Sequence, residues 1–295
     1  MLNSTQSSLE DYLAYRLVEY VNLTGLFITS FGILMNIFCF LTINKFKFKN
    51  SSLTLIKCQA IWDSIAIFHD GYFELGGIYF NFNPYNLNGI FCKVLWFHSM
   101  GSTLTAIYHM VFVALDRVFA IHYPIIYKQR SKPSVAYKLS LILAVFGYGL
   151  ISQNLVTFEI VKSECILAAS VTYKYWFINI IGVGFSFAIP FTLVFLSNVY
   201  FLQSLRRRQK ENSTERRLTI MLLTNSIAFC LLMLAFISLN TADFFVGTTT
   251  MEGRAFLILI GRLKFNFLVL NSSANFIFYF VSGSMFREAF FRIFK

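Results

Sequence analysis

The sequence predicts an all-α membrane protein, in which a seven-transmembrane helix bundle is followed by a short amphipathic eighth helix. Three observations support this fold class. The 295-residue chain is 57% hydrophobic and only 13% charged, whereas soluble domains carry about 25% charged residues. Seven apolar runs are long enough to cross a bilayer, which takes about 20 residues each. Positive charge also gathers at one end of these runs, as is typical of membrane helices.

The seven apolar runs follow one another with short connections. They lie at about 20–43, 53–73, 91–120, 138–158, 176–202, 218–240 and 256–281. The chain has only four prolines, so most of the runs can form uninterrupted helices. We therefore divide the chain into an extracellular N-terminus (1–19), a seven-transmembrane domain (20–281) and a cytoplasmic amphipathic helix (282–295).

Charge predicts the orientation of the bundle. With the N-terminus outside, 18 of the 25 Lys and Arg residues fall in inner loops, at inner helix ends or in the C-terminal tail. The positive-inside rule therefore predicts a multi-pass protein of the plasma membrane with its N-terminus outside. We interpret the net charge of +11 as an orientation signal that also attracts anionic lipid headgroups, not as a nucleic-acid footprint. Asn3 begins a glycosylation sequon on the outer side.

The cysteines fit this orientation. Cys39, Cys58 and Cys230 lie in or at the edge of apolar runs, where a thiol usually acts as a small hydrophobe. Cys92 and Cys165 lie on the outer side, where an oxidising environment permits their pairing. A bridge between them would hold the loop before the fifth run across the mouth of the bundle.

The tail after Gly283 predicts the eighth helix, because aromatic and basic residues alternate there as in helices that lie in the inner membrane interface. These residues are Phe286, Arg287, Phe290, Phe291, Arg292, Phe294 and Lys295.

Asp116-Arg117-Val118, at the inner end of the third run, is the most informative short motif. An adjacent acid and base at the edge of an apolar segment is costly near lipid, and such pairs persist where charge is needed. Cys92 lies 25 residues before Arg117, and Pro124 lies 7 residues after it. This spacing indicates a membrane receptor that couples to a partner in the cytosol. Taken alone, the tripeptide would be an ordinary basic anchor beside the membrane.

The chain resembles the rhodopsin-like (class A) G-protein-coupled receptors from Gly32 to Phe294. The matching residues, in order and at matching spacing, are Gly32, Asn36, Asp63, Cys92, Asp116, Arg117, Pro124, Cys165, Phe187, Pro190, Glu215, Phe229, Asn271, Ser272, Asn275, Tyr279 and Phe286. Three departures stand out: Val118 replaces a Tyr, Met233-Leu234-Ala235 replaces Trp-x-Pro, and Phe276 replaces a Pro. The sixth and seventh helices thus lack their usual proline kinks, and we infer that the activation hinge works differently here or is weaker.

The resemblance implies a switch for a heterotrimeric G protein, built from Asp116, Arg117, Glu215, Asn275 and Tyr279. At rest, Arg117 would pair with Asp116 and with Glu215; on activation it would be freed to meet the G protein. The resemblance also implies a disulfide between Cys92 and Cys165.

The resemblance further implies an allosteric sodium ion at Asp63, Asn271, Ser272 and Asn275, and no other cofactor. Ala106 stands where a Ser usually helps to bind that ion. The alternative is a protonated or water-bridged Asp63 that only joins helices, since polar contacts commonly do so in membrane bundles.

The ligand pocket is expected in the outer halves of the helices. Ser99 stands where amine receptors carry an Asp, and Val269 stands where opsins carry a retinal-linked Lys, so a monoamine receptor and a photopigment are both disfavoured. Mixed polar and aromatic residues favour a peptide, and for each of them singly the alternative is helix capping or interfacial snorkelling. The candidates are Trp96, His98, Ser99, Ser102, Asn240, Asp243, Arg262 and Asn266.

The sequence therefore predicts a receptor for an extracellular ligand, a neuropeptide, with no catalytic residues. Two alternatives stay open: a multi-span transporter or channel, or an atypical, constitutively biased receptor. An intramembrane enzyme is disfavoured, because no second carboxylate or nucleophile motif accompanies His98 and His109.

Overall fold

A computed structural model of the chain describes residues 2–73, 76, 79, 82–167, 180–207, 213–245 and 251–295. Within these ranges it describes all side chains except those of 2–15, 70, 180–183, 205–207, 213–216, 240, 242–245 and 251–255. The sequon at Asn3 and the side chains of Glu215, Asn240 and Asp243 therefore lie outside the described residues.

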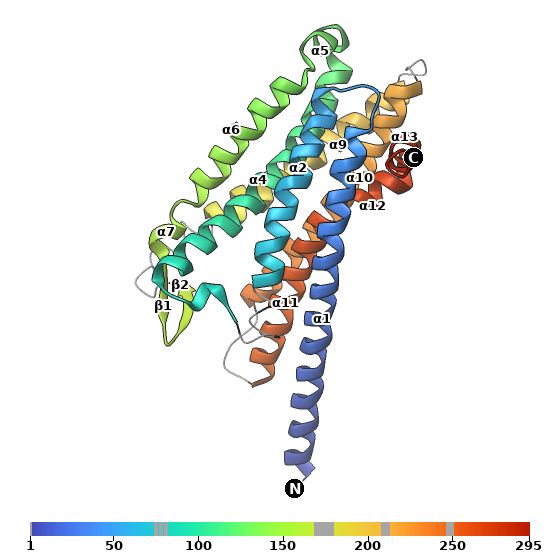
Figure 1. The fold of residues 1–295 in the computed structure, drawn as a ribbon. Helices are drawn as coiled ribbons and strands as arrows, with labels where there is room; N and C mark the ends of the chain where they lie inside the picture. The colour runs from blue at the N-terminus through green and yellow to red at the C-terminus, as the bar shows by residue number, and fades with distance from the viewer. Residues whose placement is uncertain are drawn as a thin grey trace.

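The protein is a seven-transmembrane helix bundle followed by a short C-terminal helix (Figure 1). The long helices are α1 (Leu2–Asn44), α2 (Ser51–Ile67), α4 (Gly89–His122), α6 (Pro133–Ile151), α9 (Ile189–Arg207), α10 (Ser213–Phe245) and α11 (Met251–Ser273), which α12 (Asn275–Ser282) continues. Three short helices are α5 (Pro124–Arg130), α7 (Asn154–Thr157) and α13 (Ser284–Phe291). The predicted multi-pass membrane fold is confirmed.

The described residues also contain two π-helical segments and one 3-10 turn. They are η1 (Phe68–Phe73), η4 (Ile180–Ala188) and η2 (Pro84–Asn86). Among the described helices, six are long and apolar enough to cross a membrane by themselves. The second span is the exception, because α2 has 17 residues and reaches further only through η1. The first helix begins at Leu2, upstream of the expected start at residue 20.

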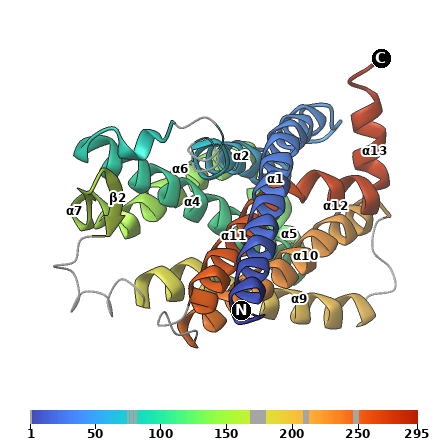
Figure 2. The same cartoon turned by 90° about the horizontal axis from the view of Figure 1, so that it is seen from below.

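The helix α4 is the centre of the bundle, because it contacts α2, α6, α9 and α10 (Figure 2). Close packing of α4 on α6 depends on two glycines. A Cβ at Gly101 would stand 2.7 Å from the ring of Tyr148, and one at Gly147 would stand 2.7 Å from Oγ1 of Thr105. Small residues at such crossings allow the backbones to approach, which is the main source of helix association in lipid.

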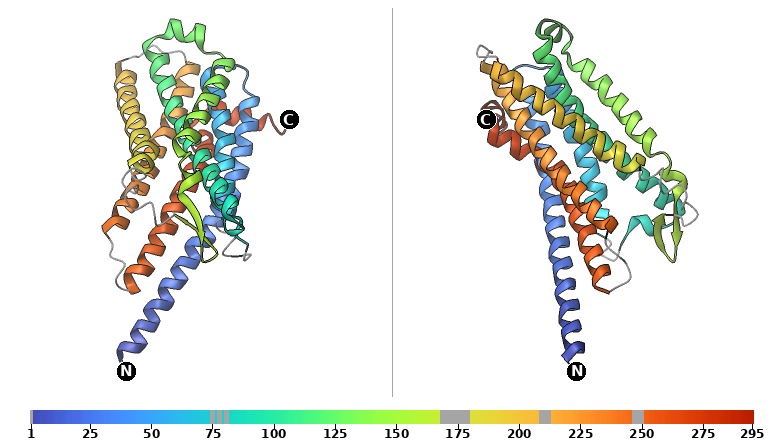
Figure 3. Two further views of the ribbon diagram at one scale, coloured as in Figure 1. Left: turned by 90° about the vertical axis from the view of Figure 1, so that its left-hand side faces the viewer. Right: turned by 180° about the vertical axis from the view of Figure 1, so that it is seen from behind.

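The helix α1 lies along α11, and its N-terminal part extends beyond the other helices (Figure 3). Gly32 lies at this contact, where an added Cβ would overlap the side chain of Ser273. The glycine of the predicted Gly-x-x-x-Asn motif therefore allows a close approach between the first and seventh helices.

A β-hairpin covers one end of the bundle, in addition to the predicted helices. Its strands, β1 (Phe158–Val161) and β2 (Glu164–Leu167), are antiparallel, with Val161 opposite Glu164. Lys162 and Ser163 both have positive φ, as a two-residue primed turn requires. The predicted disulfide between Cys165 and Cys92 is present and ties this hairpin to the first turn of α4. We call this end of the bundle the disulfide end, and the opposite end the Arg117 end.

The sixth and seventh helices differ in continuity. The helix α10 runs without a break through Met233, as the missing proline predicts. The seventh helix, in contrast, is interrupted between Ser273 and Asn275, where Ala274 has ψ of −11°. The interruption thus occurs although Phe276 replaces the usual proline. The side chain of Asn275 bonds to other groups at this point, so an interruption does not need a proline.

The C-terminal helix α13 packs against α1 and α12 at the Arg117 end of the bundle. Phe286 is fully buried against Phe276 and Tyr279. Arg287 donates to the carbonyl oxygens of Phe280 and Val281, each at 2.8 Å, and so caps the end of α12. The predicted short amphipathic eighth helix is confirmed.

Candidate functional site

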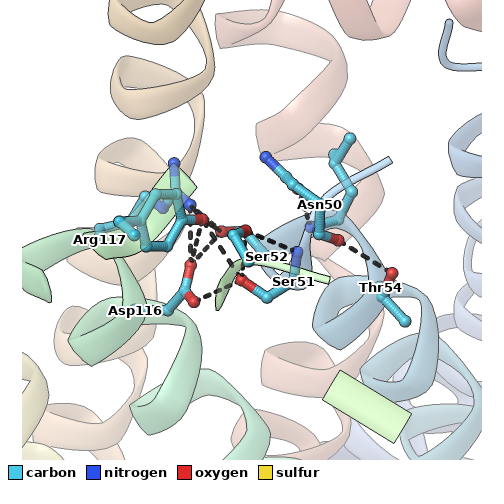
Figure 4. A network of polar contacts seen from close by, with 9 residues as sticks. Asn50, Ser51, Ser52, Thr54, Asp116 and Arg117 are labelled. Atoms are coloured by element: carbon cyan, nitrogen blue, oxygen red, sulfur yellow. Dashed lines mark hydrogen bonds and ion pairs between the residues drawn. The ribbon is translucent and has the colours of Figure 1, made fainter. Parts of the chain in front are cut away.

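Arg117 and Asp116 form the centre of a polar network near the Arg117 end of α4 (Figure 4). Nη2 of Arg117 lies 2.7 Å from Oδ2 of Asp116, and their side chains are only 8% and 15% exposed. The same nitrogen donates to the hydroxyls of Ser52 and Tyr127. The guanidinium also lies over the Tyr127 ring, with Cζ 5.3 Å from its centroid. The arginine is thus held by several partners at once.

The carboxylate of Asp116 is equally well satisfied. It accepts hydrogen bonds from Ser51 Oγ at 2.7 Å and from Tyr127 Oη at 3.0 Å, and another from Ser52. Charge-assisted bonds of this kind are stronger than those between neutral groups. We call this cluster of Ser51, Ser52, Asp116, Arg117 and Tyr127 the latch.

Local backbone structure explains why two serines meet Asp116. Asn50 is the N-cap of α2, and its Oδ1 accepts from the backbone N–H of Leu53 at 2.9 Å. The cap fixes the start of α2, so that Ser51 and Ser52 form its first turn. Ser51 is also tied to the segment after α5, because its backbone N–H donates to Oγ of Ser131 at 3.0 Å.

Neither Ser51 nor Tyr127 was a candidate from the sequence. The segment Asn50-Ser51-Ser52 matched only a glycosylation pattern. Its other property, an Asn followed by hydroxyl residues at the start of an apolar run, is an N-cap signal and could have located the serines. Nothing in the sequence around Tyr127 indicated its partners.

A small cavity of about 10 Å³ lies beside the latch, between α4, α9 and α10. Arg117 lines it together with Asn198 and Phe201 of α9 and Thr219 and Leu222 of α10. These helices are therefore packed closely around the arginine. The predicted partner Glu215 belongs to α10, but its side chain lies outside the described residues.

A second polar chain crosses the middle of the bundle. Nδ2 of Asn225, on α10, lies 3.0 Å from both Oδ1 of Asn275 and Oη of Tyr279. Nδ2 of Asn275 in turn donates to Oδ2 of Asp63 at 2.8 Å. All four residues are buried. These hydrogen bonds join α2, α10 and α12. We call the group of Asp63, Asn225, Asn275 and Tyr279 the central chain.

Asn225 was absent from the sequence candidates, although it links two of them. An amide inside an apolar run is costly unless it finds partners, and this property could have marked the residue. Asn275 and Tyr279, which we predicted as switch residues, are both bonded to Asn225 in the central chain. Neither of them bonds directly to the latch in the part of the molecule that the structure describes.

The surroundings of Asp63 agree with part of the predicted sodium ligand set. Its buried carboxyl group accepts a hydrogen bond from Nδ2 of Asn275 at 2.8 Å, and the side chains of Ser272 and Gln59 lie close to it. Asn271 is only half-buried and is not among these partners. Two buried amide oxygens, Oδ1 of Asn36 and Oε1 of Gln59, have no hydrogen-bond partner. Carboxylate, hydroxyl and free amide oxygens are suitable ligands for a hard cation.

The predicted ligand-pocket residues whose side chains the structure describes do not gather at one point. Ser99 and Ser102 are neighbours on the buried face of α4, and Oγ of Ser102 donates to the Ser99 carbonyl at 2.8 Å. Asn266 instead donates to the Val21 carbonyl at 2.8 Å and joins α11 to α1. Arg262 is half-buried and also has interaction partners.

The two aromatic candidates, Trp96 and His98, face η1, α6 and the hairpin. Trp96 stacks on Phe158 of β1, with ring centroids 5.0 Å apart. Nδ1 of His98 lies 2.6 Å from Oη of Tyr148, and its ring packs edge-on against His69 at 4.5 Å. Packing around the disulfide end therefore holds both side chains, and Nε1 of Trp96 is buried there without a hydrogen-bond partner.

Comparison with known proteins supports the arrangement of helices and motifs. The chain matches the family model described as 7 transmembrane receptor (rhodopsin family) over residues 77–279. This match contains the disulfide, the latch residues of α4 and α5, and most of the central chain. No curated protein matches the chain. The chain belongs to the seven-transmembrane receptors of the rhodopsin family.

Proposed function

We propose that the protein is a plasma-membrane receptor that binds an extracellular peptide and promotes nucleotide exchange on a heterotrimeric G protein. The observation that carries this proposal is the latch: Arg117 is held 2.7 Å from Asp116 beside a cavity of only about 10 Å³. An arginine stays charged under all physiological conditions, so its release would present a cation to a partner.

The helix α10 is the element that has to move for such a partner to reach Arg117. Thr219 and Leu222 of α10 close the small cavity on one side. Displacement of α10 would widen the cavity and uncover Arg117. A ligand that favours the displaced form would shift the population of receptors toward it. The cavity size supports reading the present conformation as the resting one.

The distribution of charge supports an N-terminus outside the cell. The short helix α5 and the residues after it carry Lys128, Arg130 and Lys132, all exposed at the Arg117 end. Cys92 and Cys165 form their bridge at the opposite end. Basic residues prefer the cytosolic side and disulfides the oxidising side, so both observations support the same orientation.

A peptide ligand is supported by the chemistry of the disulfide end. Aromatic, amide and charged groups are mixed there, and this mixture suits the side chains and backbone of a peptide. Sodium is the proposed allosteric ion. Asp63, Ser272 and the free amide oxygens of Asn36 and Gln59 would hold it, and its charge would stabilise the ionised carboxylate.

The proposal is tested in two steps. A peptide library is first screened on cells that express the receptor with promiscuous G proteins. Arg117→Ala is then compared with the wild type and with Lys128→Ala, which removes a cation from the same end but outside the latch. We expect Arg117→Ala to lower agonist-driven nucleotide exchange at least about tenfold, or ~1.4 kcal/mol, with unchanged surface expression.

Two results would contradict the proposal. Exchange that is the same in Arg117→Ala and in the wild type would remove the switch role of the arginine. Ion flux through the purified protein in liposomes without any G protein would instead support a transporter or channel.

A further inference from the structure

A second, larger cavity lies at the Arg117 end, on the side of the latch away from α10. Its volume is about 330 Å³, and it is an open hollow lined by residues of α2, α4, α5 and α6. This volume is within the range of roughly 300–1,000 Å³ that is typical of ligand pockets. Most of its wall is apolar and comes from Leu55, Phe112, Leu115, Val135 and Leu139. The wall therefore suits a hydrocarbon chain.

The cavity is bordered by a surface that faces lipid. Val135 of α6 and Phe119 of α4 both line it, and they are 49% and 39% exposed. Further along α6, Leu141, Ile142 and Val145 are each more than 60% exposed. An apolar helix face of this kind in a membrane protein contacts acyl chains. A molecule can thus reach the cavity from the bilayer.

The rim of the cavity toward the water carries an available positive charge. Arg130, at the end of α5, lines the cavity and is exposed. It forms no ion pair or hydrogen bond with any described side chain. Asp116 also lines the cavity, but Arg117 and three hydroxyl groups already neutralise its carboxylate. The fork of an arginine fits a phosphate or a carboxylate.

We propose that this cavity binds a membrane phospholipid with an anionic headgroup. The headgroup contacts Arg130, and one acyl chain lies against the wall formed by Phe112, Leu115 and Leu139. A free phosphate would leave the apolar wall empty, and a neutral sterol would leave Arg130 without a partner. The charge and the wall together therefore select an anionic amphiphile from the leaflet at the Arg117 end.

The site has a consequence for the latch. Asp116 and Tyr127 belong both to the latch and to the wall of the cavity. A bound lipid covers these two residues from the side of α6 and keeps water away from their hydrogen bonds. Low local polarity strengthens such bonds. The lipid thus stabilises the latched form, independently of any G protein.

The test uses the purified full-length protein in nanodiscs of phosphatidylcholine that contain a small fraction of lipid with a photoreactive acyl chain. The probe carries either a phosphatidylserine or a phosphatidylcholine headgroup, and crosslinked residues are mapped by mass spectrometry. Arg130→Gln removes the proposed headgroup contact. Lys128→Gln is the matched control, because it removes a cation from the same short helix outside the cavity wall.

We expect the serine probe to label the α4 and α6 walls in preference to the choline probe. Arg130→Gln should lower this preference about fivefold, the effect of one cation on an anionic headgroup, and Lys128→Gln should leave it unchanged. Val135→Trp should fill the cavity and reduce labelling, whereas Val145→Trp, on the same exposed helix face, should not.

The proposal is overturned if both glutamine variants lose the preference equally, because the attraction is then only that of the basic surface. It is also overturned if the choline probe or a photoreactive sterol labels the cavity as well as the serine probe does. Neither result depends on G-protein coupling, so the lipid site and the proposed function can fail separately.

Discussion

The latch and the central chain are two polar clusters of similar size, but they join different parts of the bundle. The latch connects α4 to the start of α2 and to α5, through Ser52, Asp116 and Tyr127. The central chain connects α10 to α12 and α2, through Asn225, Asn275 and Asp63. In the described part of the molecule, no hydrogen bond joins Arg117 to α10.

The sequence predicted one switch, whereas the structure divides its described residues between two clusters with different contacts. The latch holds the arginine and keeps its charge satisfied. The central chain holds α10, the helix that closes the small cavity beside that arginine. We therefore propose that the predicted switch of Asp116, Arg117, Glu215, Asn275 and Tyr279 has two parts: one cluster would fix the charge, and the other would restrain α10.

The largest effect is expected at Asn225, which is 2% exposed. Among the described residues, it is the only member of the central chain that lies on α10. Asn225→Ala removes two interhelical hydrogen bonds to oxygen, each worth about 0.6–1.7 kcal/mol in membrane proteins, and a third to Sδ of Met110 on α4. We expect a lower thermal unfolding midpoint in detergent and higher basal nucleotide exchange, because α10 is released.

Asn198→Ala provides the control for Asn225. Asn198 is a buried amide on α9 that also contacts α10. Its side chain bonds there to Ser226 at 2.5 Å and to Cys230, not to the central chain. If Asn198→Ala raises basal exchange as much as Asn225→Ala, general loosening of α10 explains the effect and the central chain has no special role.

The sequence was sufficient for the parts of the fold that follow from hydropathy and from single costly residues. Seven apolar runs predicted the spans. The outer position of two cysteines permitted the disulfide, which the family resemblance implied. An isolated acid in a membrane helix indicated a polar centre at Asp63. These features are predictable because lipid penalises an unsatisfied polar group wherever it occurs.

Contacts between distant segments could not be predicted in the same way. Ser52 and Tyr127 lie 64 and 11 residues from Asp116, and only the packing of α2 and α5 on α4 brings them together. The hairpin turn at Lys162 and Ser163 has neither Gly nor Asn, so it lacks the usual turn signal. The interruption at Ala274 occurs without a proline, next to Asn275, whose side chain bonds to Asp63.

A smaller effect is expected when the latch is weakened instead of the central chain. Tyr127→Phe removes the hydroxyl that donates to Asp116 at 3.0 Å and accepts from Arg117, but keeps the ring beside the guanidinium. Two serines still bond to the carboxylate, so the loss is about 1 kcal/mol. Basal exchange should rise less than in Asn225→Ala, as measured with the same purified G protein.

Tyr123→Phe is the matched control for Tyr127, because it changes the same type of residue one turn earlier, where the side chain is 48% exposed. Equal effects of the two tyrosine variants would show that the latch hydroxyl is not involved. A larger effect of Tyr127→Phe than of Asn225→Ala would reverse the order of the two clusters.

The smallest effect is expected at Asn50, which acts on the latch only through the start of α2. Asn50→Ala removes the cap bond to Leu53 N–H and costs about 1 kcal/mol of local helix stability. Asn50→Asp keeps a cap acceptor and serves as the control. Amide hydrogen exchange in the first turn of α2 should accelerate in the alanine variant alone, while the thermal midpoint stays within error. Because Ser51 and Ser52 lie in that turn, basal nucleotide exchange that matched Tyr127→Phe would mean that the cap, and not the phenol, sets the strength of the latch.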